Sequence, residues 1–246
     1  MTEEKIQEDT LLNGHKILQN PQSFMFGIDA VLLAHFASSF IRKKDCVMDL
    51  CCGNGIIPLL LDTASTAKKI SGLEIQPASV QLAAKSVELN GLGDKIQIVE
   101  GDLKNVKKLF EQKSFSLITC NPPYMLADSG KINPADSKAI ARHEIFCTLE
   151  DVIKAASYLL DDCGSMCMIH RPNRLADLIY LCKKYKMEPK TLRMILPFEN
   201  KSPTMVLLEA RKSAKADLKV LEHLTVYKSK GQYSDEVQEI YRSFTK

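Results

Sequence analysis

Residues 46–56 read CVMDLCCGNGI, a short apolar run ending near an acid, then a turn with two glycines and the start of another apolar run. This order is typical of a buried β-strand, a tight turn and an α-helix, where backbone N–H groups come close to a ligand. The dinucleotide-binding pattern has three spaced glycines, and here Cys51 stands where the first would be. The motif therefore predicts a strand–turn–helix ligand site and argues against pyrophosphate chemistry.

Alternating β-rich and helical segments continue along the chain. The helix expected at 77–90 has a proline in its first turn, apolar residues at three-to-four spacing and an Asn-Gly stop. This alternation is typical of βαβ units in a mainly parallel sheet. We expect five such strands, at 46–50, 69–74, 96–100, 116–120 and 165–170, with further helices at 149–160 and 173–186.

The alternation of strands and helices ends after the helix expected at 173–186. Segments 191–196 and 204–209 are separated by a loop too short for a crossover helix, which predicts an antiparallel pair. An extended run at 224–227 and a helix capped by Ser234 and Asp235 complete the pattern. The fold class is therefore α/β, a mixed sheet of about seven strands with helices on both faces. We expect one domain, residues 1–246, with a lead-in at 1–44, a core at 45–211 and a C-terminal extension at 212–246.

Composition and charge exclude several classes of protein. Of the 246 residues, 45% are hydrophobic and 26% charged, and 33 basic against 30 acidic residues give a net charge of +3. This balance excludes an acidic disordered chain and a histone-like polycation, and it permits a nucleic-acid partner that binds a local basic face. The polar, acidic start differs from an export signal, and the longest apolar run, 56–61, is far shorter than the ~20 residues of a membrane span. We therefore expect a soluble cytoplasmic protein without a membrane partner.

Eight cysteines raise the question of disulfides or a metal site. Several, such as Cys46 and Cys167, lie within apolar runs, and the chain is long enough to form a core without covalent cross-links. Zinc ligands usually come as Cys-x-x-Cys pairs, which the sequence lacks. We expect free, packed thiols and no bound metal.

Acidic residues mark the ends of the first three expected strands: Asp49, Glu74 and Asp102. Because the carboxyl ends of parallel strands share one edge of the sheet, these carboxylates are expected to meet beside the glycine turn. Together they would repel a pyrophosphate and suit a cationic nucleoside such as S-adenosylmethionine, with Asp49 at the ammonium, Glu74 at the ribose and Asp102 at the adenine amino group. Each acid alone also fits a solvated loop or a helix cap. The expected cofactor set adds Cys51, Gly53, Gly55, Ile75, Leu103 and Asn121.

The segment Asn121-Pro122-Pro123-Tyr124 directly follows the fourth expected strand. Two prolines stiffen the backbone, so the Asn121 side chain and the Pro122 carbonyl are aimed at the same ligand edge. Both oxygens can accept hydrogen bonds from an amino group whose lone pair is delocalised into a ring, and Tyr124 can stack on that ring. A rigid polar turn is the alternative. We expect these four residues to form the catalytic set, with no metal or covalent intermediate required.

Together with the glycine turn, this segment resembles the class I S-adenosylmethionine-dependent methyltransferases that act on planar nitrogens: adenine N6, guanine N2 or the glutamine amide. The resemblance implies a Rossmann-like fold, S-adenosyl-L-methionine as cofactor and transfer of a methyl group to nitrogen.

Most of the chain further resembles one subfamily, the bacterial valine-tRNA adenine-N6 methyltransferases, which modify the adenine 3′ of the anticodon. The lead-in at 22–34, QSFMFGIDAVLLA, is similar to that of the subfamily and implies that Phe26, Gly27 and Asp29 line the cofactor site. Residues 141–144, ARHE, are similar as well. The resemblance implies tRNA as the partner, and the basic residues expected to contact its phosphates are Arg142, Arg171, Arg174 and Lys201.

Other substrates share the same motif chemistry. N5-glutamine methylation of a peptide release factor is one, although such enzymes usually carry a separate helical N-terminal domain and here residues 1–44 alone precede the first expected strand. Guanine-N2 methylation of rRNA and adenine-N6 methylation of rRNA or DNA are others. A non-catalytic RNA-binding module with the same fold is disfavoured by the intact 121–124 segment.

Overall fold

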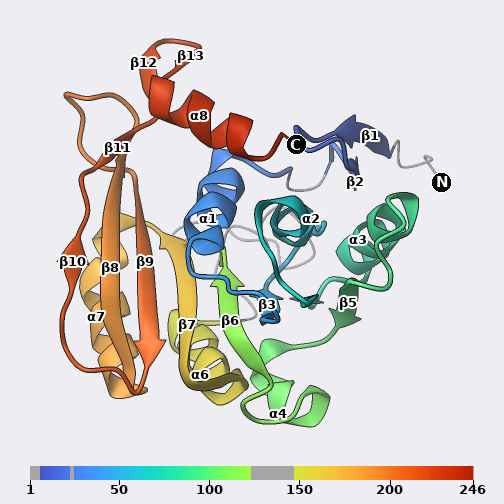
Figure 1. Cartoon of the computed structure of the whole chain (residues 1–246), viewed down its shortest axis with the longest axis horizontal. Coiled ribbons are helices and arrows are strands. Elements are labelled where there is room, and N and C mark those ends of the chain that lie inside the picture. The colour runs from blue at the N-terminus through green and yellow to red at the C-terminus, as the bar shows by residue number, and fades with distance from the viewer. Residues whose placement is uncertain (1–5, 23–24, 123–146, 246) are drawn as a thin grey trace.

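A mixed sheet of nine strands forms the centre of the molecule (Figure 1). The computed structural model describes residues 6–22, 25–122 and 147–245. The strands are β3 (Cys46–Leu50), β4 (Lys69–Glu74), β5 (Ile96–Glu100), β6 (Phe115–Cys120), β7 (Leu160–His170), β8 (Met187–Leu196), β9 (Met205–Lys212), β10 (Lys219–Val220) and β11 (Leu224–Thr225). Their order is β10-β8-β9-β7-β6-β3-β4-β5, and β11 also pairs with β8.

Strand directions follow the alternation of the sequence. The neighbours β7, β6, β3, β4 and β5 run parallel, whereas β9 is antiparallel to both β7 and β8. The α/β fold and the antiparallel pair at the end of the core are therefore confirmed. The parallel strands place the carboxyl ends of β3, β4, β5 and β6 at one edge of the sheet, where open α/β sheets bind ligands.

Two strands of two residues each raise the sheet from the expected seven strands to nine. Both β10 and β11 pair in parallel with β8. Strand β11 lies within the extended run expected at 224–227, whereas β10 is too short to show the alternation that reveals longer strands. The run expected at 224–227 is divided, because its last residue begins β12 (Tyr227–Ser229), which forms a separate hairpin with β13 (Gln232–Tyr233).

Helices cover both faces of the sheet (Figure 1). One hydrophobic core joins the sheet to the first three helices and the last, and a second core joins its other face to the remaining helices. None of the helices in the described ranges is long and apolar enough to cross a membrane. The first set is α1 (Ile28–Ser38), α2 (Ile56–Ala64), α3 (Pro77–Leu89) and α8 (Asp235–Ser243), and the second is α4 (Val106–Leu109), α6 (Leu149–Leu159) and α7 (Leu175–Lys184).

Helix ends follow the expected capping chemistry. The hydroxyl oxygen of Ser234 accepts the N–H of Val237 at the start of α8, as the sequence predicts. At α6, Thr148 and Asp151 form a reciprocal capping box. Pro77 stands in the first turn of α3, where its missing N–H costs no hydrogen bond.

Helix α1 is apolar on nearly all sides. It packs against α2, β7, β9 and α8, and α8 lies across the top of the view above it (Figure 1). A helix that is hydrophobic all round has to be buried on all sides. Its buried residues are Ala30, Val31, Leu32, Leu33, Ala34, Phe36 and Ala37.

An N-terminal hairpin precedes α1, which the sequence did not reveal. Strands β1 (Gln7–Thr10) and β2 (Lys16–Gln19) pair antiparallel, and β2 lies against α3. The Asp62 carboxylate at α2 receives His15 Nε2 at 2.8 Å and Lys95 Nζ at 2.7 Å. Asn13 Nδ2 donates to the Leu59 carbonyl at 3.0 Å. The contacts of His15 and Asn13 fasten the hairpin to α2.

Candidate active site

The turn after β3 contains three residues with positive φ: Cys51 at 60°, Gly53 at 54° and Gly55 at 83°. Cys51 thus keeps the left-handed backbone of the glycine it stands in place of, at some conformational cost. A Cβ at Gly55 would lie 3.1 Å from the Cβ of Ala83, so a larger residue would crowd α3. No described atom lies within 4 Å of a Cβ built at Gly53. The turn therefore presents open backbone at the carboxyl edge of the sheet.

Glu74, at the end of β4, holds this turn. Its side chain is 5% exposed, and its Oε2 accepts the N–H of Gly53 at 2.9 Å. Its other oxygen, Oε1, accepts the N–H of Gln76 at 2.9 Å. The carboxylate is thus fixed beside the turn with lone pairs left for further donors. Its contact with a ribose stays a prediction, and its second role, holding the turn through the Gly53 N–H, has no signal in the sequence.

Asp49 is the most deeply buried acid of the site, at 1% exposure. Its Oδ1 accepts the hydroxyl hydrogen of Thr119 at 2.7 Å, and its Oδ2 has no hydrogen-bond partner among the described residues. The pKa of Asp49 is raised to about 8. Burial is the main cause, the hydrogen bond from Thr119 opposes it, and the negative charge of Glu74 adds to it. A buried carboxylate oxygen without a partner fits a site that receives a cationic group.

Asp102 has a partner of its own. Its Oδ1 accepts the N–H of Lys104 at 2.9 Å, and its Oδ2 lies 3.5 Å from Lys104 Nζ. It thereby caps the short 3-10 helix Leu103–Asn105 that follows β5. The cap explains why an acid occurs here, while its contact with an adenine stays a prediction. Ile75 is half-buried after β4, and Leu103 is buried.

Asn121, which follows β6, reaches a residue from the distant lead-in. Its Nδ2 donates to Asp29 Oδ2 at 3.2 Å, a contact between residues 92 positions apart. A Cβ at Gly27 would lie 2.8 Å from Asp29 Oδ1, so glycine there leaves room for this carboxylate. Because a carboxylate only accepts hydrogen bonds, the amide nitrogen of Asn121 faces Asp29 and its carbonyl oxygen turns elsewhere. Phe26 packs against the core beside α1.

The expected catalytic set is described only in part. Pro122 is buried directly after Asn121. Pro123, Tyr124 and Arg142 lie outside the described residues, so their expected roles stay predictions.

The family comparison agrees with this geometry. The model of the methyltransferase small domain matches residues 28–177, from the start of α1 into α7. The chain belongs to this family.

Curated relatives of this methyltransferase match most of its length. A tRNA1(Val) (adenine(37)-N6)-methyltransferase of Porphyromonas gingivalis is 28% identical over 225 residues, which cover 89% of this chain and 87% of the relative. A protein of the same name from Shewanella loihica is 27% identical over 223 residues, covering 88% and 90%. A solved structure of a predicted O-methyltransferase from Agrobacterium tumefaciens superposes with a TM-score of 0.70 at 20% identity, over 88% of this chain and 97% of the other. This last likeness supports the fold alone.

The expected phosphate-binding residues of the methyltransferase are only partly gathered. Arg171, which follows β7, donates from Nη1 to the Thr204 carbonyl at 3.1 Å, so it lies beside the loop between β8 and β9 that carries the exposed Lys201. Arg174 instead donates to Asp177 Oδ2 at 2.8 Å, which neutralises part of its charge. His170, which directly precedes Arg171, is 1% exposed, and burial lowers its pKa to about 4. This histidine is therefore neutral at physiological pH.

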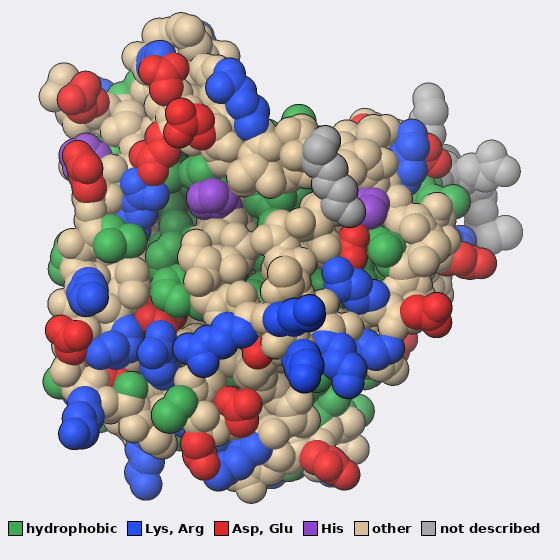
Figure 2. Space-filling view, viewed as in Figure 1, with side chains coloured by type: hydrophobic (Ala, Val, Ile, Leu, Met, Phe, Trp, Pro, Cys, Tyr) green, Lys and Arg blue, Asp and Glu red, His purple; other side chains and the backbone are tan. Residues whose placement is uncertain are grey.

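The surface of the methyltransferase is locally basic. Figure 2 shows Lys and Arg side chains gathered in a band across the face in view, with acidic side chains mainly above and below it. A net charge of only +3 thus hides a basic region of the kind that phosphates favour.

Three thiols of the methyltransferase meet beside the turn. Cys51 is hydrogen-bonded to Cys120 and Cys147, and the bond with Cys120 raises the pKa of Cys51 well above its usual value. All eight cysteines are free, as expected. Within the ranges that the structure describes, no three His, Cys, Asp or Glu residues are placed to hold a metal ion. The raised pKa values keep the Cys51 and Cys120 thiols neutral, and the expected place of Cys51 at the cofactor stays a prediction.

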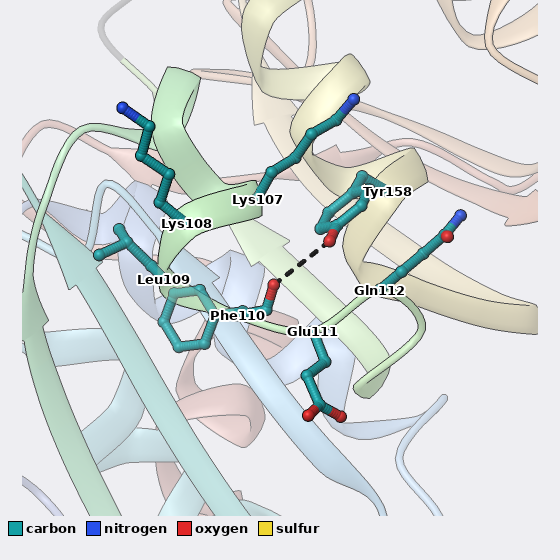
Figure 3. A pocket seen from close by; sticks show the side chains of 7 residues that line it. All are labelled: Lys107, Lys108, Leu109, Phe110, Glu111, Gln112 and Tyr158. Carbon is teal, nitrogen blue, oxygen red and sulfur yellow. Dashed lines mark hydrogen bonds between the residues drawn. The ribbon is translucent and has the colours of Figure 1, made fainter.

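A separate hollow of 440 Å³ lies between α4 and α6 (Figure 3). Tyr158 Oη donates to the Phe110 carbonyl at 3.3 Å across it, and Lys107 Nζ lies 5.6 Å from the centre of the Tyr158 ring. The hollow includes the segment that leads into the amino end of β6, opposite the carboxyl edge. It is therefore distinct from the candidate active site.

Proposed function

We propose that this methyltransferase transfers a methyl group to N6 of adenine 37 in tRNA(Val) in the cytoplasm, with S-adenosylmethionine as donor. The observation that carries the proposal is the hydrogen bond from Asn121 to Asp29, which turns the amide nitrogen of Asn121 toward α1 and orients this side chain at the edge that carries the buried acids. The names of the relatives and the locally basic surface support a tRNA substrate.

Three acidic residues and the glycine turn would hold the cofactor. When bound, S-adenosylmethionine supplies a methyl group on a positively charged sulfur. The unpartnered Oδ2 of Asp49 accepts from the ammonium group, and the remaining lone pairs of Glu74 accept from the ribose hydroxyls. Asp102 accepts from the adenine amino group, and the open backbone at Gly53 lets the ligand come close. The acids thus match a cationic ligand without phosphate.

Asn121 and Pro122 prepare the adenine amino nitrogen. This nitrogen is a poor nucleophile because its lone pair is delocalised into the ring. When the carbonyl oxygens of Asn121 and Pro122 accept its two N–H groups, the pyramidal form with a localised lone pair is favoured. Tyr124 stacks on the base and keeps the nitrogen in line with the methyl group. The methylated nitrogen is acidic, so its extra proton can leave without a strong base.

Cofactor binding should release a proton at pH 7. With a pKa of about 8, free Asp49 is largely protonated at this pH, and an ammonium group at Oδ2 takes the place of the proton. Affinity should therefore rise with pH and level off above pH 8. Calorimetry in buffers of different ionisation enthalpy should give close to one proton released per cofactor.

Asp49→Asn supplies the control for this measurement, because it keeps the shape of the side chain and removes the titration. It should bind the cofactor weakly and without pH dependence between pH 6 and 8. The assignment of Asp49 fails if both proteins release the same number of protons.

Methyl transfer from labelled S-adenosylmethionine tests the proposed function directly. Bulk tRNA from a strain that lacks this gene is compared with rRNA, duplex DNA and a peptide release factor, and the product is analysed by nucleoside mass spectrometry. We expect N6-methyladenosine in tRNA(Val) alone. Label only in the release factor would reassign the enzyme to glutamine methylation, and cofactor binding without label in any substrate would overturn the proposal.

A further inference from the structure

The N-terminal hairpin touches the glycine turn through one buried amide. Gln19, the last residue of β2, is 2% exposed. Its Oε1 accepts a hydrogen bond from Asn54 Nδ2 at 3.2 Å, and its Nε2 donates to Asp9 Oδ2 at 2.7 Å. Asn54 stands between Gly53 and Gly55, the two glycines of the turn. The amide therefore links a carboxylate on β1 to the centre of the turn.

The direction of this link is fixed by Asp9. A carboxylate only accepts hydrogen bonds, so the nitrogen of the Gln19 amide faces Asp9 and its oxygen faces Asn54. The other oxygen of Asp9 accepts from Gln7 Nε2 at 2.7 Å, which holds the carboxylate in place. Three side chains of the hairpin thus form a chain that ends on Asn54.

This side-chain link adds to two backbone hydrogen bonds of the turn, from the Cys52 N–H to the Leu73 carbonyl at 3.1 Å and from the Gly55 N–H to the Cys52 carbonyl at 2.9 Å. Glycines on both sides give the backbone around Asn54 wide conformational freedom. Glu74 fixes the Gly53 N–H from the sheet, but no described atom packs near a Cβ position at Gly53. The bond from Asn54 to Gln19 holds the turn through a side chain, from the side of the hairpin.

We propose that Gln19 is a positioning residue for cofactor binding: through Asn54 it fixes the backbone of the glycine turn in the conformation that receives S-adenosylmethionine. The proposal rests on the proposed function, since it takes this turn as the cofactor site. Fixing a flexible binding segment in advance improves affinity because less ordering remains to be done on binding.

Gln19→Leu removes both hydrogen bonds with little change in size. Calorimetry with S-adenosylmethionine should show about tenfold weaker binding, while kcat at saturating cofactor stays within twofold of wild type. The matched control is Asn13→Ala in the same hairpin, which loses the bonds to Leu59 and Thr63 on α2 but makes none to the turn. This control should lower the melting temperature and leave the Kd for the cofactor unchanged.

Two substitutions that move a carboxylate between positions 9 and 19 distinguish a positioning role of Gln19 from a general destabilisation of the hairpin. Gln19→Glu sets two carboxylates against each other at Asp9 and should weaken cofactor binding at neutral pH relative to wild type, and the ratio of the two Kd values should approach one as pH falls and one carboxyl becomes protonated. Adding Asp9→Asn restores a donor opposite the new carboxylate and keeps an acceptor for Asn54. The double variant should recover most of the wild-type affinity.

The outcomes are distinct. Wild-type protein that binds no S-adenosylmethionine overturns the proposed function. Wild-type binding with equal affinity in Gln19→Leu overturns the role of Gln19 alone, and so does a folded double variant that recovers none of the affinity lost in Gln19→Glu. A loss of affinity in Asn13→Ala as large as that in Gln19→Leu would show that only the attachment of the hairpin matters.

Discussion

Asn121→Ala is expected to lower kcat for methyl transfer by about 10²–10³-fold and to leave the affinity for S-adenosylmethionine within a few-fold of wild type. The substitution removes the carbonyl oxygen that accepts from the adenine amino group, an interaction that strengthens as the nitrogen becomes pyramidal. It also frees Asp29 from its hydrogen bond at 3.2 Å, without touching Asp49 or Glu74. Single-turnover kinetics with saturating cofactor and tRNA measure the effect, and calorimetry measures cofactor binding.

A matched control for this substitution is Asn105→Ala. Asn105 is exposed at the end of the 3-10 helix after β5, beside the same edge of the sheet. Its removal should leave kcat and cofactor affinity unchanged. If Asn121→Ala weakened cofactor binding as much as it lowered kcat, Asn121 would act on the cofactor alone and its assigned part in catalysis would be wrong.

Glu74→Ala should raise the Kd for S-adenosylmethionine by about 100-fold, the second large effect. It leaves the N–H groups of Gly53 and Gln76 without their acceptor and removes the carboxylate expected at the ribose. Hydrogen bonds to a charged group are stronger than neutral ones, so both losses weigh on the turn. Calorimetry gives the Kd, and circular dichroism shows whether the protein stays folded.

Two variants calibrate the Glu74 measurement. Glu74→Gln keeps one acceptor oxygen and should give an intermediate Kd. Glu100→Ala removes an exposed carboxylate at the position directly opposite on β5, where Glu74 and Glu100 are register partners. An equal loss of affinity in Glu100→Ala would indicate that cofactor binding depends on the total negative charge at this edge. The specific contacts of Glu74 would then not explain its effect.

The long strands and the location of the site could be predicted from the sequence because both depend on local order. Apolar runs of five or six residues between helical segments show themselves directly, and the carboxyl ends of parallel strands have to share an edge. That is why Asp49, Glu74 and Asp102 could be assigned to one edge before any coordinates were known. The two-residue strand β10 and the N-terminal hairpin leave no such pattern.

The contacts between distant segments could not be predicted. Asn121 was recognised from its prolines, but nothing in its surroundings points to Asp29, 92 positions away. The partner of Asp49 on β6, Thr119, was missed for the same reason. A single sequence shows the residue types that a site needs, but it does not show which distant residues come into contact.

The surroundings of α1 determine the order in which the molecule can be completed during translation. This helix leaves the ribosome early, yet its partners β7, β9 and α8 are made much later, and His35 hydrogen-bonds to Ser243 at 3.2 Å. Until the last residues emerge, the nascent chain carries an apolar helix with several of its sides uncovered. Such a segment is a binding site for chaperones and a starting point for aggregation. The element that supplies Asp29 to the candidate active site thus also needs protection during synthesis.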